Sequence, residues 1–266
     1  MIKSKIPALS LYLKFKYLMM KVLYRHPLLF NEIRFRFWIT TLKTGVRNEK
    51  ELKVLPRLVT PGMTVIDIGA HCGRYTIPLS YLVGQRGRVL SFEQVTTNYR
   101  ILERLKRKYG LTNVVLFKEA LVEHSGKGII AMPITSNGIY SYSCSSILQD
   151  DSIDRSICKL HQCVEIDTLD NIALTDSIDR CGYMKIDVEG YELFVLRGGV
   201  ELLDRFRPVV QCEIIESHTL EFEYRPDDLV SFMNDMGYEM YIYSNGLEHL
   251  HEVTPDTLIT SLFRSI

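Results

Sequence analysis

The sequence predicts a doubly wound α/β domain, and three observations lead to that fold class. Short apolar runs alternate with segments of helical periodicity from residue 64 onward. The first apolar run ends in a glycine-containing turn that leads directly into a helical segment, and an acidic residue follows the second run. Strands that alternate with helices of about a dozen residues need crossover connections, which place parallel strands side by side. We therefore expect a mostly parallel sheet with helices on both faces.

The first half of this domain contains three predicted strands and two predicted helices. Runs rich in Val, Ile, Leu and Phe are typical of buried strands. They occupy residues 65–68, 88–92 and 114–117. A helix is expected over residues 74–83. Apolar side chains recur on one side of residues 97–109, and Gly110 ends the pattern, which predicts a second helix there.

The second half repeats the strand pattern twice. Buried strands are expected over residues 183–188 and 209–215, each adjoining helical sequence. Before them, residues 137–156 are rich in Ser, Tyr and Asp and have little apolar pattern. Long irregular segments in compact domains are usually functional or disordered. We therefore expect a long loop or lid over residues 137–156.

Composition and charge describe a folded protein with a basic amino-terminal part. Of the 266 residues, 46% are apolar and 24% are charged, which excludes disordered, collagen-like and coiled-coil classes. Residues 1–58 contain 13 Lys and Arg against three acids, a net charge of +10, although the whole chain is neutral. We expect a basic helical extension over residues 1–48 and the α/β domain over residues 49–266.

The extension contains an amphipathic helix and a second apolar, basic stretch. From about Ala8 to Tyr24, basic residues fall on one helical face and apolar residues cover most of the rest. Pro27 then interrupts the pattern, and residues 33–39 include Trp38, the only Trp in the chain. Two interpretations stay open. The extension either lies in the interface of an anionic membrane, with its aromatics at the headgroups, or forms a helical cap on the domain.

Cysteine usage and the charges in the extension bear on the compartment. The chain has six cysteines and no CxxC pair, so we expect free thiols in a reducing environment. Charged residues interrupt the apolar stretch from Ile6 to Phe30, which argues against a signal peptide and a membrane span. We expect a cytoplasmic protein, peripheral on the inner face of a membrane under the first interpretation.

No metal site is predicted, because Cys158, His161 and Cys163 have no second ligand cluster at zinc-finger spacing.

The glycine-containing turn, from Asp67 to Gly73, predicts a nucleoside pocket. Gly69 permits a tight turn, Gly73 would let the helix approach a ligand, and the helix amino terminus presents unpaired amides. Glu93 follows Gly73 by twenty residues, at the carboxyl end of the second predicted strand. An acid at that place accepts hydrogen bonds from ribose hydroxyls. The order of strand, turn, helix, strand and acid therefore indicates an adenosine-containing cofactor.

The glycine spacing favours one cofactor over another. A dinucleotide fingerprint, GxGxxG, has a middle glycine that admits a pyrophosphate, whereas Ala70-His71-Cys72 separate the two glycines here. The Asp67 carboxylate would repel a diphosphate but suits the cationic S-adenosylmethionine and its amino group. We therefore expect S-adenosylmethionine.

The segment Val65 to Thr76, VIDIGAHCGRYT, resembles the first motif of class I S-adenosylmethionine-dependent methyltransferases, and in particular that of the FkbM family. Further family landmarks follow in order, and the resemblance spans roughly residues 50 to 215. They are Phe92-Glu93, Asn98-Tyr99, Glu119-Ala120-Leu121 and the distinctive KIDVEGYE at residues 185–192. The resemblance implies the seven-stranded, mostly parallel sheet of class I methyltransferases. It also implies O-methylation of a hydroxyl on a sugar, glycan or other small molecule.

The resemblance extends the set of expected cofactor-binding residues. The full set is Asp67, Gly69, His71, Gly73, Glu93, Glu119 and Ala120. His71 stands where the family commonly has Asn, and Gln94 where it commonly has Pro. A charged imidazole would be unfavourable beside a sulfonium, so we expect His71 to be neutral if it lines the pocket.

Two carboxylates in KIDVEGYE are candidates for catalysis. Apolar residues alternate with Asp187 and Glu189, so both carboxylates are expected on one side at the end of the fourth strand, where open α/β sheets bind ligands. They could take a proton from an acceptor hydroxyl, hold a metal or bind sugar hydroxyls. Alternatively, they cap the helix that begins at Gly190. Lys185 and Glu213 are expected behind them on adjacent strands.

Two other functions stay open from the residues alone. One is a catalytically silent cofactor-binding or membrane-scaffolding domain, and the other is a nicotinamide-dependent oxidoreductase. A nucleic-acid partner is not expected, because the basic residues cluster outside the α/β domain and no nucleic-acid motif is present. The expected partners are a small-molecule or glycan acceptor and, under the first interpretation of the extension, an anionic membrane surface.

Overall fold

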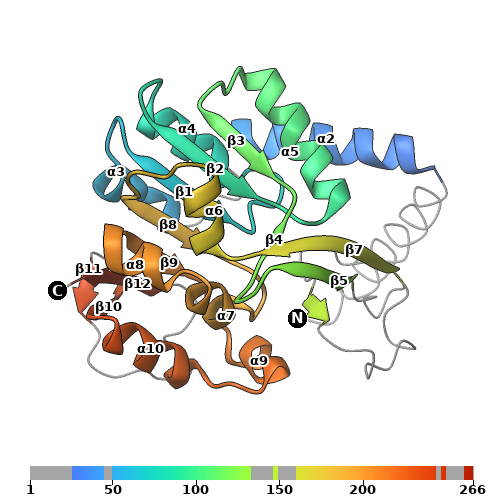
Figure 1. Ribbon diagram of the computed structural model, residues 1–266. Helices are drawn as coiled ribbons and strands as arrows, with labels where there is room; N and C mark the ends of the chain where they lie inside the picture. Colours follow the sequence, from blue (N-terminus) through green and yellow to red (C-terminus); the bar gives the residue numbers. More distant parts are fainter. Residues whose placement is uncertain are drawn as a thin grey trace, which may run out of the picture.

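The computed structural model describes residues 26–44, 50–132, 146–148, 160–243, 247–249 and 261–265. An eight-stranded sheet forms its centre, with the strand order β11-β10-β12-β9-β8-β1-β2-β3 (Figure 1). The strands are β1 (Thr64–Ile68), β2 (Arg88–Phe92), β3 (Val114–Phe117), β8 (Tyr183–Ile186), β9 (Val209–Cys212), β10 (Tyr238–Tyr243), β11 (Leu247–His249) and β12 (Ser261–Ser265).

The order of these strands confirms the predicted fold class. Strands β3, β2, β1, β8 and β9 are parallel neighbours. Strand β12 lies antiparallel between β9 and β10, and the short β11 is added beside β10. The result is the expected seven-stranded, mostly parallel sheet with one extra edge strand. The sheet grows outward in both directions from β1, to β2 and β3 on one side and to β8 and β9 on the other, and this reversal of strand order between β1 and β8 creates the switch point at which such sheets bind ligands.

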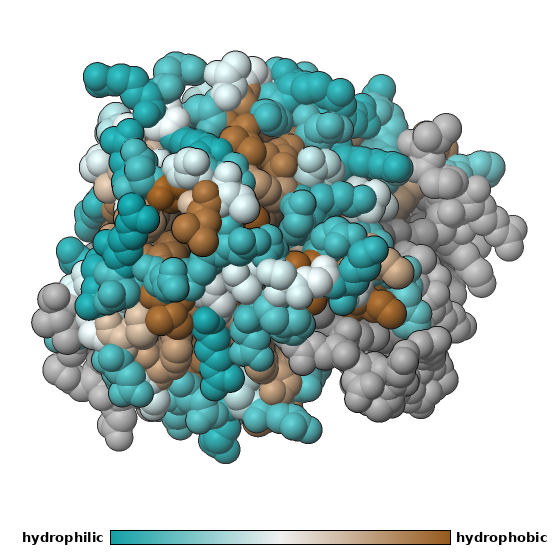
Figure 2. Space-filling view, in the orientation of Figure 1, coloured by the Kyte–Doolittle hydropathy of each residue, from teal (hydrophilic) through white to brown (hydrophobic). Residues whose placement is uncertain are grey.

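Alternate residues of β1 divide the core into two layers. Val65 packs on the side of α3, α4 and α5, whereas Ile66 and Ile68 pack on the side of α6, α7, α8 and α10. These helices are α3 (Leu55–Leu58), α4 (Thr76–Val83), α5 (Thr96–Tyr109), α6 (Leu169–Thr175), α7 (Glu192–Arg197), α8 (Val200–Phe206) and α10 (Pro226–Asp235). The face seen in Figure 2 is mainly hydrophilic, with apolar residues in separated groups. That distribution fits a core placed between the sheet and its helices.

A second, four-stranded sheet was not predicted from the sequence. It has the order β4-β7-β5-β6, and β5 and β7 extend side by side away from the main sheet (Figure 1). Its strands are β4 (Ala120–Leu121), β5 (Gly126–Met132), β6 (Ser146–Leu148) and β7 (Leu160–Asp167). The predicted loop over residues 137–156 is corrected at β6, which pairs with β5. The rest of that segment lies outside the described residues.

Helix α2 (Pro27–Thr44) of the extension packs on α5. Arg104 donates a hydrogen bond of 2.7 Å to Glu32, and its guanidinium lies 3.7 Å from the centroid of the Phe35 ring. Trp38 is buried, with 6% of its surface exposed, so it does not lie at a headgroup boundary. The side of α2 that carries Trp38 therefore caps the domain. The amphipathic segment from Ala8 to Tyr24 and the predicted boundary at residues 48 and 49 are outside the described part.

None of the helices in the described ranges combines the length and the apolar character that a membrane crossing requires.

Candidate functional site

The turn between β1 and α4 depends on two glycines in the left-handed region. Gly69 has φ 77° and Gly73 has φ 84°, where other residues are strained. A Cβ on Gly69 would lie 1.8 Å from the main-chain oxygen of Asp187, so this turn passes directly over the end of β8. A Cβ on Gly73 would lie 2.7 Å from Leu102 of α5. Gly73 thus permits close packing of α5, and its role beside a ligand stays a prediction.

The Asp67 side chain lies inside the sheet, and one of its two carboxylate oxygens can accept a further hydrogen bond. The Thr76 hydroxyl donates a hydrogen bond of 2.6 Å to Oδ2, while Oδ1 is buried and has no donor within the described ranges. Burial raises the pKa of Asp67, although the Lys185 ammonium and the Thr76 hydroxyl oppose that rise. A buried acceptor without a donor is unfavourable. Asp67 therefore fits the predicted role of accepting a hydrogen bond from a bound cofactor.

Glu93 directly follows β2 and connects it to the glycine turn. Its Oε2 accepts a 2.7 Å hydrogen bond from the main chain of His71, and its Oε1 accepts hydrogen bonds from Val95 and Asn98. Burial raises the pKa of Glu93 to about 7 against these hydrogen bonds. A carboxylate offers about four lone-pair sites. One acceptor site on Oε2 is therefore left for a ribose hydroxyl.

His71 lies between the glycine turn and helix α2. Its ring meets that of Trp38 edge to face, with 5.1 Å between the centroids. Burial lowers the pKa of His71 to about 4, and the Arg34 guanidinium adds to this effect. The imidazole is therefore neutral at physiological pH, as expected for a residue next to a cationic cofactor.

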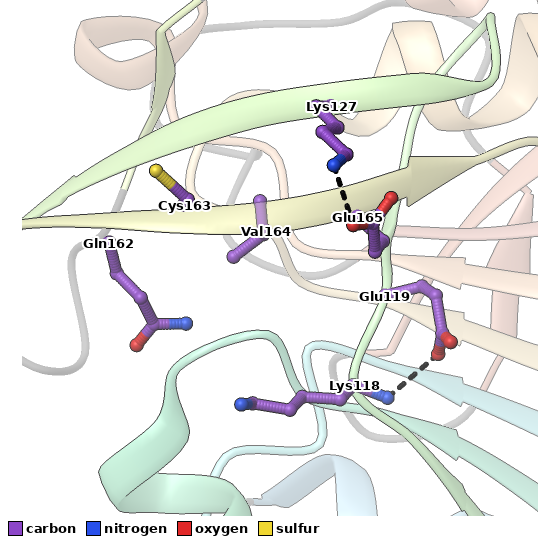
Figure 3. Close-up of a pocket in the computed structure, with 7 residues that line it drawn as sticks. All are labelled: Lys118, Glu119, Lys127, Gln162, Cys163, Val164 and Glu165. Carbon is purple, nitrogen blue, oxygen red and sulfur yellow. Dashed lines mark hydrogen bonds and ion pairs between the residues drawn. The ribbon is translucent and has the colours of Figure 1, made fainter.

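The structure places Glu119 and Ala120 directly after β3, where the chain passes into the second sheet, and their contact with the cofactor stays a prediction. Glu119 lines a groove of about 390 Å³ between the β3–β4 connection and the β5–β7 pair (Figure 3). The other lining residues are Lys118, Lys127, Gln162, Cys163, Val164 and Glu165. Gln162 connects this groove to residues after Glu93, because its side chain donates to Gln94 and accepts from Thr96. Ala120 is buried in the core of the second sheet, so its side chain is not available to a ligand.

Asp187 is partly exposed and forms an ion pair with the buried ammonium of Lys185. Strand β8 ends at Ile186, which corrects the prediction that Asp187 lies on the strand. Lys185 Nζ lies 2.7 Å from Asp187 Oδ2. Burial alone would raise the pKa of Asp187, but the Lys185 ammonium holds it below its ordinary value. Glu213, directly after β9, hydrogen-bonds to Asp187, and burial together with the Asp187 charge raises the pKa of Glu213 to about 8.

Glu189 is a partly exposed carboxylate and has a partner that the sequence analysis missed. Its Oε2 lies 3.2 Å from Nδ1 of His218, and the two side chains are 25% and 30% exposed. Burial and the Asp187 charge raise the pKa of Glu189 to about 7. His218 belongs to α9 (Glu216–Thr219). Its position shortly after the predicted strand 209–215, at the same sheet edge, was the available sequence signal.

Glu192 shapes the loop that carries Asp187 and Glu189. Its Oε1 accepts hydrogen bonds from the main chains of Val188 and Gly190, at 3.0 and 3.3 Å. Helix α7 begins at Glu192. The alternative of a carboxylate that caps the start of the following helix therefore applies to Glu192. Glu189 instead faces His218.

The described residues bring the expected site together in two parts. Asp67, His71 and Glu93 surround the glycine turn, and the Asp187–Glu189 loop lies beside it at the end of β8. Within the described part of the chain, no group of three or more His, Cys, Asp or Glu side chains is arranged to hold a metal.

Comparison with known proteins bears on this arrangement. A model of the methyltransferase FkbM domain matches residues 67–240 of the chain. Similar solved structures include the methyltransferase FkbM from Methylobacillus flagellatus KT, at 16% identity and a TM-score of 0.47, covering 80% of this chain and 50% of that one. A SAM-dependent methyltransferase from Aquifex aeolicus matches at 16% identity and a TM-score of 0.43, covering 80% and 87%.

A third similar structure is a putative rRNA-methylase from Clostridium thermocellum, at 12% identity and a TM-score of 0.45, covering 82% and 94%. The chain spans about half the length of the Methylobacillus protein.

Proposed function

The chain belongs to the FkbM family of S-adenosylmethionine-dependent methyltransferases, and we propose that it methylates a hydroxyl group on a sugar, glycan or other small molecule. The observation that carries this proposal is the position of Glu189. Its carboxylate is partly exposed, has a pKa raised to about 7 and belongs to the loop under the glycine turn. A general base works best when its pKa is near the working pH.

The residues around the glycine turn fit the cofactor. When bound, S-adenosylmethionine supplies an electrophilic methyl group on a sulfonium. Asp67 Oδ1 offers an acceptor for the cofactor's amino group, and Glu93 Oε2 offers one for the ribose hydroxyls. His71 adds no positive charge near neutral pH, because its pKa is lowered to about 4. The negative carboxylates of the pocket suit a cation.

Glu189 is the residue we propose to take the proton from the acceptor hydroxyl. Asp187 is less suited to this role, because its ion pair with Lys185 holds its pKa low. We propose that Asp187 instead orients the acceptor, next to the turn that holds the cofactor. His218 contacts Glu189 from α9 and fixes the direction of the carboxylate. Orientation and proton removal are the two contributions that an already electrophilic methyl group requires.

A labelled-methyl screen tests the proposed acceptor class. The full chain would be incubated with methyl-labelled S-adenosylmethionine and sugar, lipid-linked glycan and polyketide hydroxyl acceptors. Each hit would be retested as the analogue in which an amine replaces the hydroxyl. Transfer to the hydroxyl compound alone supports O-methylation. Transfer only to amines would contradict it, and cofactor binding without any transfer would favour the catalytically silent domain.

We also propose that α2 contacts the anionic inner face of a membrane, which would place a cytoplasmic enzyme near lipid-linked acceptors. Leu29, Ile33 and Phe37 recur every four residues on α2 and are 52%, 42% and 47% exposed. Arg36 lies on the same side of the helix and is also exposed. Residues 1–58 carry a net charge of +10. Exposed apolar residues flanked by cations favour an anionic lipid surface.

A further inference from the structure

Helix α2 contacts the residues that surround the cofactor pocket. Arg34 Nη2 donates a 2.6 Å hydrogen bond to Asn98 Oδ1 on α5, and Trp38 packs against His71 of the glycine turn. The sequence analysis assigned neither Arg34 nor Trp38 to the site. The extension therefore covers the glycine turn and also contacts it through specific side chains.

Arg34 determines which way the Asn98 amide points. A guanidinium has only donors, so it pairs with the amide oxygen and not with the amide nitrogen. The Asn98 nitrogen is then directed to Glu93 Oε1, at 3.4 Å. Asn98 is only 1% exposed, so water does not compete for either end of the amide. A reversed amide would present its oxygen to the Glu93 carboxylate, which is repulsive.

We propose that Arg34 is a positioning residue for the cofactor's ribose. It acts through Asn98, whose amide holds the Glu93 carboxylate with Oε2 available beside the main chain of His71. Helix α2 is then part of the cofactor site. The proposal rests on the role given to Glu93 above, and the experiment separates the two.

Other contacts hold α2 on the domain, so Arg34 can be replaced without displacing the helix. Glu32 and Phe35 attach α2 to Arg104 independently of Arg34, and Trp38 is buried in the adjoining core layer. Removing the Arg34 side chain should therefore leave α2 in place. Arg36 provides the matched control, because it lies on the same helix, carries the same charge and is exposed.

The experiment measures S-adenosylmethionine affinity of the full chain by calorimetry and by the fluorescence of Trp38, the only Trp present. Arg34→Ala should weaken affinity by about 10- to 100-fold, the scale of a hydrogen bond to a charged group. Arg34→Lys, which can still donate to the amide oxygen, should recover part of the loss. Arg36→Ala should bind like the wild type. KM for the cofactor should rise while kcat at saturation stays within about twofold, because Arg34 acts on binding.

A second substitution separates positioning from a general structural role. In the Asn98→Ala background, Arg34→Ala should cause little further loss, since the two residues act through one contact. Normal affinity of a folded Arg34→Ala protein, together with weak binding by Glu93→Gln, would overturn the inference and leave Glu93 in the site. Normal affinity of Glu93→Gln as well would overturn both assignments.

Discussion

Nδ1 of His218 lies 3.2 Å from Oε2 of Glu189, and this contact joins the loops that follow β8 and β9. Glu189 has φ 58°, a backbone conformation that is unfavourable for a residue with a side chain and often occurs at functional sites. Gly190 packs closely on the main chain of His218. These contacts hold the Glu189 carboxylate at the end of the sheet, next to the residues that we assign to the cofactor.

Glu93→Gln tests the cofactor site. The substitution keeps an acceptor and the size of the side chain but removes the negative charge that we expect to receive the ribose hydroxyls. S-adenosylmethionine affinity should fall by about 1.5 to 3 kcal/mol, the range for hydrogen bonds to a charged group, as measured by calorimetry. A melting temperature equal to that of the wild type would show that the variant is folded. Unchanged affinity would remove Glu93 from the site.

Glu192→Gln tests whether Glu192 shapes the loop without serving as a base. Burial raises the pKa of Glu192 from 4.5 to about 7, so the folded chain binds this proton more tightly than the unfolded chain. Stability then falls as pH rises between these two values. Glutamine keeps the acceptor oxygen for Val188 and Gly190 and has no charge to bury.

The Glu192→Gln protein should therefore melt several degrees above the wild type at pH 8, since about 1 kcal/mol shifts Tm by about 2 to 4 °C in a chain of this size. The difference should shrink toward pH 5, where the wild-type carboxyl becomes protonated. Equal melting temperatures at both pH values, by calorimetric scans, would contradict this role.

Asp187→Asn tests the ion pair with the buried ammonium of Lys185. The variant leaves the Lys185 ammonium, whose side chain is only 6% exposed, without its 2.7 Å partner. Breaking one side of a buried pair costs about 3 to 5 kcal/mol, so the melting temperature should fall clearly. The double variant Lys185→Met with Asp187→Asn should recover part of the loss. A single variant as stable as the wild type would show that the pair contributes little.

Sedimentation with vesicles tests the membrane surface of α2. The full chain should sediment with anionic vesicles and less so as salt rises, because screening weakens each basic contact. Phe37→Asp should reduce sedimentation without changing cofactor affinity. Leu174→Asp on α6 is the matched control, since Leu174 is also exposed, at 69%, but lies on the opposite side of the sheet. Equal sedimentation of all three proteins, or none by any, would contradict the proposal.

The sequence predicted the parallel strands β1, β2, β3, β8 and β9 because they are buried runs that pack on both faces, and it placed Glu93 correctly after β2. The antiparallel part of the main sheet was implied only by the resemblance to the family. The second sheet escaped prediction because β5 begins with Gly126, Lys127 and Gly128, which are weak strand signals. The role of Gly73 depends on the position of Leu102, which only packing reveals.

Contacts between distant segments account for the rest of what the sequence did not predict. A helix rich in basic and aromatic residues has the same pattern whether it covers a domain or lies on a membrane. Only the burial of Trp38 and its contact with His71 show that one side of α2 covers the domain. The pairing of Glu189 with His218 likewise depends on how the loops after β8 and β9 meet.

The pH dependence of single-turnover methyl transfer, compared between the wild type and Glu189→Gln, tests the account most directly. Glu189 must be ionised to accept a proton. Burial, Asp187, Glu192 and Glu221 raise its pKa to about 7, and Lys185 opposes them. The wild-type rate should therefore rise with pH up to about 7 and then level off. Glu189→Gln should bind the cofactor normally and react about 10² to 10⁴ times more slowly, with that rise absent. A Glu189→Gln protein that keeps the wild-type rate and pH profile would contradict the assignment of Glu189 as the base.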